Sequence, residues 1–145
     1  MNLIDIFNKQ KKLRISKVSD FFQLMMRKEK YSLPSEVRIK KICKRNGKSV
    51  FLVNGFKIRK SIDIDFTMGG HGLRYVYIPI DEIWIDNSNE NECEEVLVHE
   101  LEEFNLMKNG VSYNKAHDKA SLVEVELRNT EIISQIQKES FISQN

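Results

Sequence analysis

The sequence has no hydrophobic run long enough to span a membrane. A membrane helix needs about 20 mostly apolar residues, and the longest candidates, FFQLMM at 21–26 and YVYIPI at 75–80, are only core-sized. The first residues, MNLIDIFNKQKKLR, carry an acid and amides where a signal peptide needs an unbroken apolar stretch. We therefore expect a cytoplasmic protein without a membrane segment.

Several signatures of chemistry are also missing. Cys43 and Cys93 are far apart and form no CxxC pair, which favours two free thiols over a disulfide or a cysteine-based zinc site. There is no Walker pattern around the Gly-Gly-His-Gly segment at 69–72, and no nucleophile elbow. No aspartate follows Asp118, which argues against an HD-type phosphohydrolase.

The charges are divided unevenly along the chain. Of its 145 residues 41% are hydrophobic and 30% charged, which suits one domain over 1–145. Residues 1–60 hold 17 Lys and Arg against 4 Asp and Glu, whereas residues 61–145 hold 6 against 17. This polarity predicts either a basic surface at 38–60 that binds nucleic acid or another acidic partner, or two halves that face each other.

The pattern of apolar residues predicts an α+β fold. A helical segment at 1–34 ends near Pro34, and an antiparallel sheet follows over 36–86. Alternating residues indicate strands at 36–45, 49–53 and 56–66, and Asn46-Gly47 and Asn54-Gly55 are typical hairpin turns between them. The segments 73–79 and 82–86 are expected to add further strands.

A long helix hairpin is expected over 89–138. Ser88 or Asn89 can cap its first helix, which should run to about Lys108, where Asn109-Gly110 ends it. Ser112 can cap a second helix that reaches at least Arg128.

The hairpin groups two histidines and a glutamate. His99 and Glu103 are four residues apart and share a helix face. Folding at Gly110 brings His117 level with Glu103, because both lie about five residues from the turn. His99, Glu103 and His117 together are the His₂Glu set of a catalytic zinc site with an open fourth position. The alternative is a buried polar cluster of the same three side chains without a metal.

Glu100 follows His99 directly, as the general base does in the helical HExxH motif. Here the motif reads HExxE, with a histidine 14 residues after Glu103. Several neighbouring residues could support the site, and each of them could instead have a purely structural role. Glu124 or Glu95 can orient a histidine N–H, His71 can hold a substrate oxyanion, and Tyr113 can polarise a substrate.

The segment 82–103, EIWIDNSNENECEEVLVHELEE, resembles the strand-then-helix segment of small zincin metallopeptidases. That resemblance implies a zinc-dependent peptidase, with a peptide or protein substrate aligned along strand 82–86. The wider pattern over 65–128, with GGHG, YIPIDEIWID and VHELEEFNLMKNGVSYNKAHDKA, is similar to uncharacterised bacteriophage and prophage proteins. That resemblance implies that a phage encodes the protein, which would then be located in the cytoplasm of the host cell. The alternative function is a noncatalytic phage accessory protein that binds a host protein or nucleic acid through the basic half.

Overall fold

The computed structural model describes residues 37–143, so the helical segment expected at 1–34 lies outside the described residues. The elements, in chain order, are β1 (Arg38–Arg45), β2 (Lys48–Val53), α3 (Gly55–Ser61), β3 (Gly69–His71), β4 (Glu82–Asp86), the 3₁₀ helix η1 (Asn87–Glu92), α4 (Cys93–Lys108) and α5 (Tyr113–Ile142). The expected α+β class is confirmed. No helix within 37–143 combines the length and the apolar character needed to cross a membrane.

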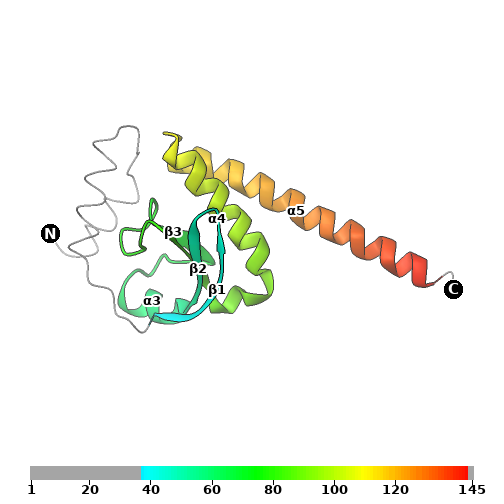
Figure 1. Cartoon of the computed structure of the whole chain (residues 1–145), viewed down its shortest axis with the longest axis horizontal. Coiled ribbons are helices and arrows are strands. Elements are labelled where there is room, and N and C mark those ends of the chain that lie inside the picture. Colours follow the sequence, from blue (N-terminus) through cyan, green and yellow to red (C-terminus); the bar gives the residue numbers. More distant parts are fainter. Residues whose placement is uncertain (1–36, 144–145) are drawn as a thin grey trace.

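The sheet is mixed, so the prediction of a purely antiparallel sheet is wrong. The strand order is β1-β2-β4-β3, and the β2–β4 pair is parallel, whereas β1–β2 and β3–β4 are antiparallel. Parallel neighbours need a crossover connection. Residues 54–81 provide it, and β3 forms within it as a short edge strand (Figure 1).

The two Asn-Gly turns behave differently. Asn46 and Gly47 have φ angles of 50° and 75°, as a two-residue hairpin turn between β1 and β2 requires. At the second pair, the side chain of Asn54 accepts a hydrogen bond from the backbone N–H of Lys57 at 3.0 Å and caps a helix. The strand expected at 56–66 is therefore replaced by α3, because capping turns the chain into a helix at this point.

The strand expected at 73–79 is also wrong. This segment forms successive turns, in which the N–H of Tyr75 donates to His71 and the N–H of Ile78 donates to Tyr75. Its side chains fill the core on several sides, and Leu73, Val76 and Ile78 are all buried. A segment buried on every side shows the same apolar run as a buried strand, so the sequence pattern alone does not separate the two.

The strand expected at 82–86 is confirmed as β4, which lies inside the sheet. Its side chains alternate between two buried clusters: Trp84 belongs to one, and Ile83 and Ile85 belong to the other. Both faces of the sheet are therefore covered, and β4 pairs with β2 on one side and β3 on the other. Among the described strands, β1 and β3 lie at the edges of the sheet, and β3 is the edge strand that contacts α4.

The helix hairpin is confirmed, with a different start. Asp86 accepts a hydrogen bond from the N–H of Ser88 and caps η1, so α4 begins at Cys93 rather than near Asn89. At the other end Gly110, with φ of 89°, donates to the carbonyl of Met107, and Val111 donates to Leu106. These two bonds form a Schellman motif that reverses the chain into α5. The second helix extends past the sheet and the first helix (Figure 1).

Candidate metal centre

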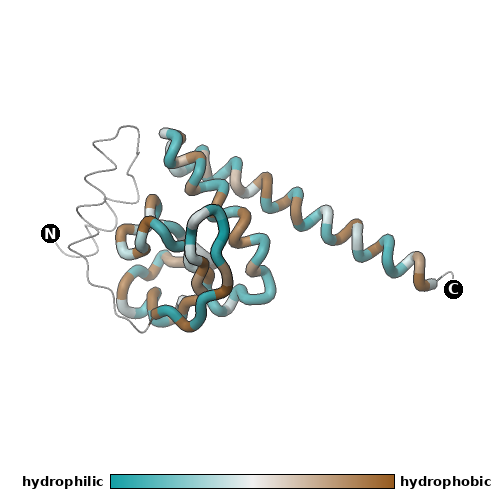
Figure 2. The backbone as a smooth tube through the Cα atoms, in the orientation of Figure 1, coloured by the Kyte–Doolittle hydropathy of each residue, from teal (hydrophilic) through white to brown (hydrophobic). Residues whose placement is uncertain are grey.

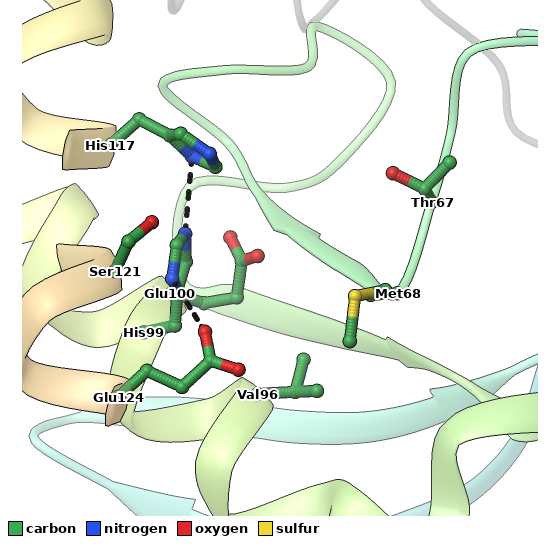
Figure 3. Close-up of a pocket in the computed structure, with 8 residues that line it drawn as sticks. All are labelled: Thr67, Met68, Val96, His99, Glu100, His117, Ser121 and Glu124. Atoms are coloured by element: carbon green, nitrogen blue, oxygen red, sulfur yellow. Dashed lines mark hydrogen bonds and ion pairs between the residues drawn. The ribbon is translucent and has the colours of Figure 1, made fainter. Parts of the chain in front are cut away.

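Three side chains of the helix hairpin converge on one point. His99 and Glu103 lie one turn apart on α4, and His117 comes from the start of α5. Nδ1 of His117 is 2.8 Å from Oε2 of Glu103 and 3.2 Å from Nε2 of His99. Nε2 of His99 is 3.3 Å from the same glutamate oxygen. Figure 3 shows the two imidazoles facing each other across the hairpin.

The triangle of these three atoms has the dimensions of a zinc coordination set. Ligands about 2.0–2.1 Å from zinc at tetrahedral angles stand about 3.3 Å from one another. The two sides that meet at Nε2 of His99 match this spacing, and the third is shorter. One proton on Nδ1 of His117, shared between the other two atoms, would also satisfy the group. The three atoms can therefore be joined either by one shared hydrogen or by one metal ion.

His71 holds Glu103 from the opposite side. Its Nε2 lies 2.9 Å from Oε1 of Glu103, and its Nδ1 accepts a hydrogen bond from the N–H of Leu73 at 3.2 Å. The neutral ring therefore carries its proton on Nε2 and donates it to the glutamate. The ring is fully buried and is not among the residues that line the pocket, so of the two roles considered for His71, support of a ligand and contact with a substrate oxyanion, the geometry favours the first. His71 fixes the carboxylate, which leaves Oε2 facing the two other histidines.

Glycines bring His71 close to α4. A Cβ added to Gly69 would lie 2.7 Å from Cγ1 of Val96, and one added to Gly70 would lie 2.6 Å from the ring of Tyr75. Side chains at these positions would push β3 away from the helix and from the core. The Gly-Gly-His-Gly segment thus serves close packing at the edge of the sheet.

Glu124 approaches the other nitrogen of His99. Its Oε2 lies 3.0 Å from Nδ1 of His99, and its Oε1 accepts hydrogen bonds from Nε and Nη2 of Arg128 at 3.1 and 2.8 Å. This contact has ion-pair distance without hydrogen-bond geometry. With its proton on Nδ1, beside this carboxylate, His99 would present the lone pair of Nε2 to the triangle. Such carboxylate–histidine pairs commonly orient metal ligands. Arg128 was not singled out from the sequence, although its position one turn after Glu124 is a recognisable signal.

A pocket of about 250 Å³ opens beside the triangle. Glu100 lies on its wall next to His99 (Figure 3). The Glu100 side chain is buried, and it has no hydrogen bond or ion pair with the described part of the chain. One of its carboxylate oxygens lies within 4.8 Å of both Glu103 and His71. The pocket is lined by Thr67, Met68, Val96, His99, Glu100, His117, Ser121 and Glu124.

Burial and neighbouring charges shift the pKa values of these groups in opposite directions. Burial, with the nearby charges of Glu103 and Glu124, raises the pKa of Glu100 well above its ordinary value. Burial alone would also raise the pKa of Glu103, but the contacts of its two oxygens with the three histidines outweigh burial and lower this pKa, so the carboxyl stays ionised. For His99, burial would lower the pKa, but Glu103 and Glu124 outweigh it and raise it. The site thus favours positive charge between its ligands.

The remaining predicted residues lie farther from the three converging atoms. Tyr113 stacks against the ring of His117 with centroids 5.5 Å apart. Arg74 lies over the ring of Tyr113 at 3.8 Å from its centroid. Glu95 lies 3.8 Å from Nη1 of Arg128, so it contacts the residue that holds Glu124 rather than a histidine.

Much of the basic segment 38–60 faces the acidic half of the chain. Three residues of β1 form ion pairs with acids that follow in the sequence: Arg38 with Glu82, Lys40 with Glu90, and Arg45 with Glu94. Arg59 pairs with Asp86. The uneven charge distribution is therefore used in part to join the two halves, which reduces the free positive charge available to a nucleic acid.

Comparison with protein-family models, curated proteins and solved structures found no match. The resemblances to zincins and to phage proteins therefore stay predictions.

Proposed function

We propose that this chain is a zinc-dependent hydrolase, most simply a metallopeptidase. The observation that carries the proposal is the convergence of Nε2 of His99, Oε2 of Glu103 and Nδ1 of His117 at coordination spacing. His71 and Glu124 support two of these ligands from outside, as metal sites require. When bound, Zn²⁺ would supply a Lewis acid and lower the pKa of water to about 7.

The residues around the pocket fit a hydrolytic role. Glu100 is the general base of this proposal, since its carboxylate lies on the pocket wall without another partner in the described residues. Its raised pKa brings it toward the pH at which a base works best. It would accept a proton from water and pass it to the leaving amine as the peptide bond breaks.

The substrate position differs from the one expected from sequence. Strand 82–86 cannot add a peptide strand, because β4 is paired on both sides. In our proposal an extended substrate pairs with the outer edge of β3, which no other strand within 37–143 occupies and which follows the pocket residues Thr67 and Met68 directly. A peptide there would pass the mouth of the pocket.

Metal analysis of the purified full chain tests the proposal. The wild type should carry about one zinc per chain, and His117→Ala and Glu103→Gln should lose it. Glu100→Gln should keep the zinc and lose hydrolysis of a peptide library. Glu94→Gln, on the same helix but outside the triangle and its supporting contacts, is the control and should keep both. A wild type that binds no zinc at micromolar free metal would overturn the proposal.

The alternative is a noncatalytic protein that binds nucleic acid or a host protein through segment 38–60. Among the described residues, Lys41 and Lys44 are exposed on β1 and would be its contacts. Binding of DNA or RNA that weakens steeply with salt, and that Lys41→Ala and Lys44→Ala reduce, would favour this alternative.

A further inference from the structure

Helix α5 carries two apolar stripes on opposite faces. If Leu122 is assigned to heptad position a, one set of small and apolar residues falls at positions b and f; Ala116 and Ala120 are buried, and Val123 and Leu127 are half-buried. A second stripe occupies positions a and d, on the other side of the helix; it consists of Leu122, Val125, Asn129, Ile132 and Ile136. We call this second stripe the a/d seam. Four of its five members are large hydrophobic residues, and all four are more than half exposed.

The seam continues where α5 leaves the rest of the chain. Every residue from Asn129 to Ser143 is exposed. At about 1.5 Å per residue, the part from 129 to 142 extends for about 21 Å (Figure 1). Hydrophobic positions recur along this extension in Figure 2.

This extension lacks the composition of a helix that is stable alone. Isolated helices of about 12–15 residues are marginal in water. Ile132, Ile133 and Ile136 are β-branched, and such residues lower helix propensity. A partner that buries the a/d seam would supply the stability that the sequence does not.

The spacing of the seam specifies the partner. Apolar residues spaced alternately three and four apart fit a second helix with the same repeat, through knobs-into-holes packing. Among residues 37–143, α5 is the helix that presents such a free repeat. We propose that the partner is α5 of a second copy of this chain, which forms a parallel two-helix coiled coil.

Asn129 determines the direction and register. In a parallel, in-register pair the two copies of Asn129 face each other at an a position and hydrogen-bond, a device that fixes register and orientation. In an antiparallel pair a positions face d positions, so each Asn129 would lie against an apolar d residue such as Ile132 of its partner and its amide would be left unsatisfied. The seam ends after Ile136, since the next d position is Glu139. Parallel pairing places the two candidate metal centres at the same end of the coiled coil.

Sedimentation of the full chain over a wide concentration range tests the pairing. The wild type should shift from monomer to dimer, and Ile132→Asp should raise the dissociation constant at least about tenfold, because it buries a charge in the seam. Ser134→Asp adds the same charge at an f position of the same helix and should leave the dimer intact. A wild type that stays monomeric at every concentration overturns the proposal. A monomer that Ile132→Asp nevertheless destabilises overturns it too, because residues 1–36 or another part of the chain would then cover the seam.

A cross-linking experiment tests the direction independently. Ile136→Cys, oxidised under mild conditions, should give a covalent dimer, because equivalent a positions face each other in a parallel pair. Wild-type chain treated in the same way controls for Cys43 and Cys93. A dimer that forms without this cross-link would overturn the parallel register.

Discussion

At the scale of single residues, the sequence indicates the ligand triangle well and its supporting contacts less well. His99 and Glu103 are found by helical spacing, and His117 by counting from Gly110. These inferences depend only on local geometry, and the three side chains do converge. The position of His71 depends on a crossover between strands. No local pattern in the sequence predicts that crossover, so its contact with Glu103 could not be foreseen.

Arg128 illustrates support at a distance from the ligands. It holds Glu124, and Glu124 contacts Nδ1 of His99. We expect Arg128→Ala to weaken zinc binding about 10- to 100-fold, the usual effect of losing outer support. Zinc competition with a chromophoric chelator measures this change. Arg128→Lys should restore part of the affinity, because it keeps the positive charge but loses the fork in which Nε and Nη2 both donate to Oε1 of Glu124.

The matched control is Arg45→Ala. It removes an ion pair with Glu94 on the exposed surface, away from the triangle. Its zinc affinity should equal that of the wild type. Equal affinities for Arg128→Ala and the wild type would show that Glu124 needs no anchor, and the zinc proposal itself would stand.

At the scale of elements, one short sequence pattern can favour two different local structures, and the sequence alone does not show which of them forms. Asn54-Gly55 is equally suited to a hairpin turn and to a helix cap. The cap prevails because the chain must cross over to form the parallel β2–β4 pair. By contrast, Gly110 favours one local structure, a helix C-terminus with positive φ. The helix hairpin predicted there is confirmed.

Gly55→Ala separates helix propensity from packing. Propensity alone predicts that alanine in the first turn of α3 stabilises the protein by up to about 1 kcal/mol. A Cβ at this position would lie 2.1 Å from Oδ2 of Asp86, a buried carboxylate that also binds Arg59 and caps η1. We therefore expect a net loss of about 1–3 kcal/mol in the free energy of unfolding. Urea denaturation measures the sign directly.

A double-mutant cycle assigns the cause of that loss. Asp86→Ala removes the clashing carboxylate, so the cost of Gly55→Ala should nearly vanish in the Asp86→Ala background. An unchanged cost in both backgrounds would mean that the glycine is needed for its backbone and not for space.

At the scale of the whole molecule, the ligand triangle joins α4 to α5, so the state of the triangle should affect global stability. In metal-free protein a proton bound to His99 can take the place of the metal ion. The pKa of His99 is raised on folding. Its protonated form therefore stabilises the fold fully below the unfolded pKa of about 6.5, and this contribution is lost as pH rises through the raised folded value.

Zinc should show the opposite pH dependence, because it competes with the proton for Nε2 of His99. At free zinc about 100-fold above its dissociation constant, the gain at pH 8 should be about 2.7 kcal/mol, or about 10 °C in the melting temperature. At pH 5.5 the zinc-induced shift should be close to zero. Thermal melts with zinc and with EDTA at both pH values measure it. His117→Ala should abolish the shift at pH 8. A wild type whose melting temperature is the same with zinc and EDTA at pH 8 would mean that the triangle closes around a proton alone.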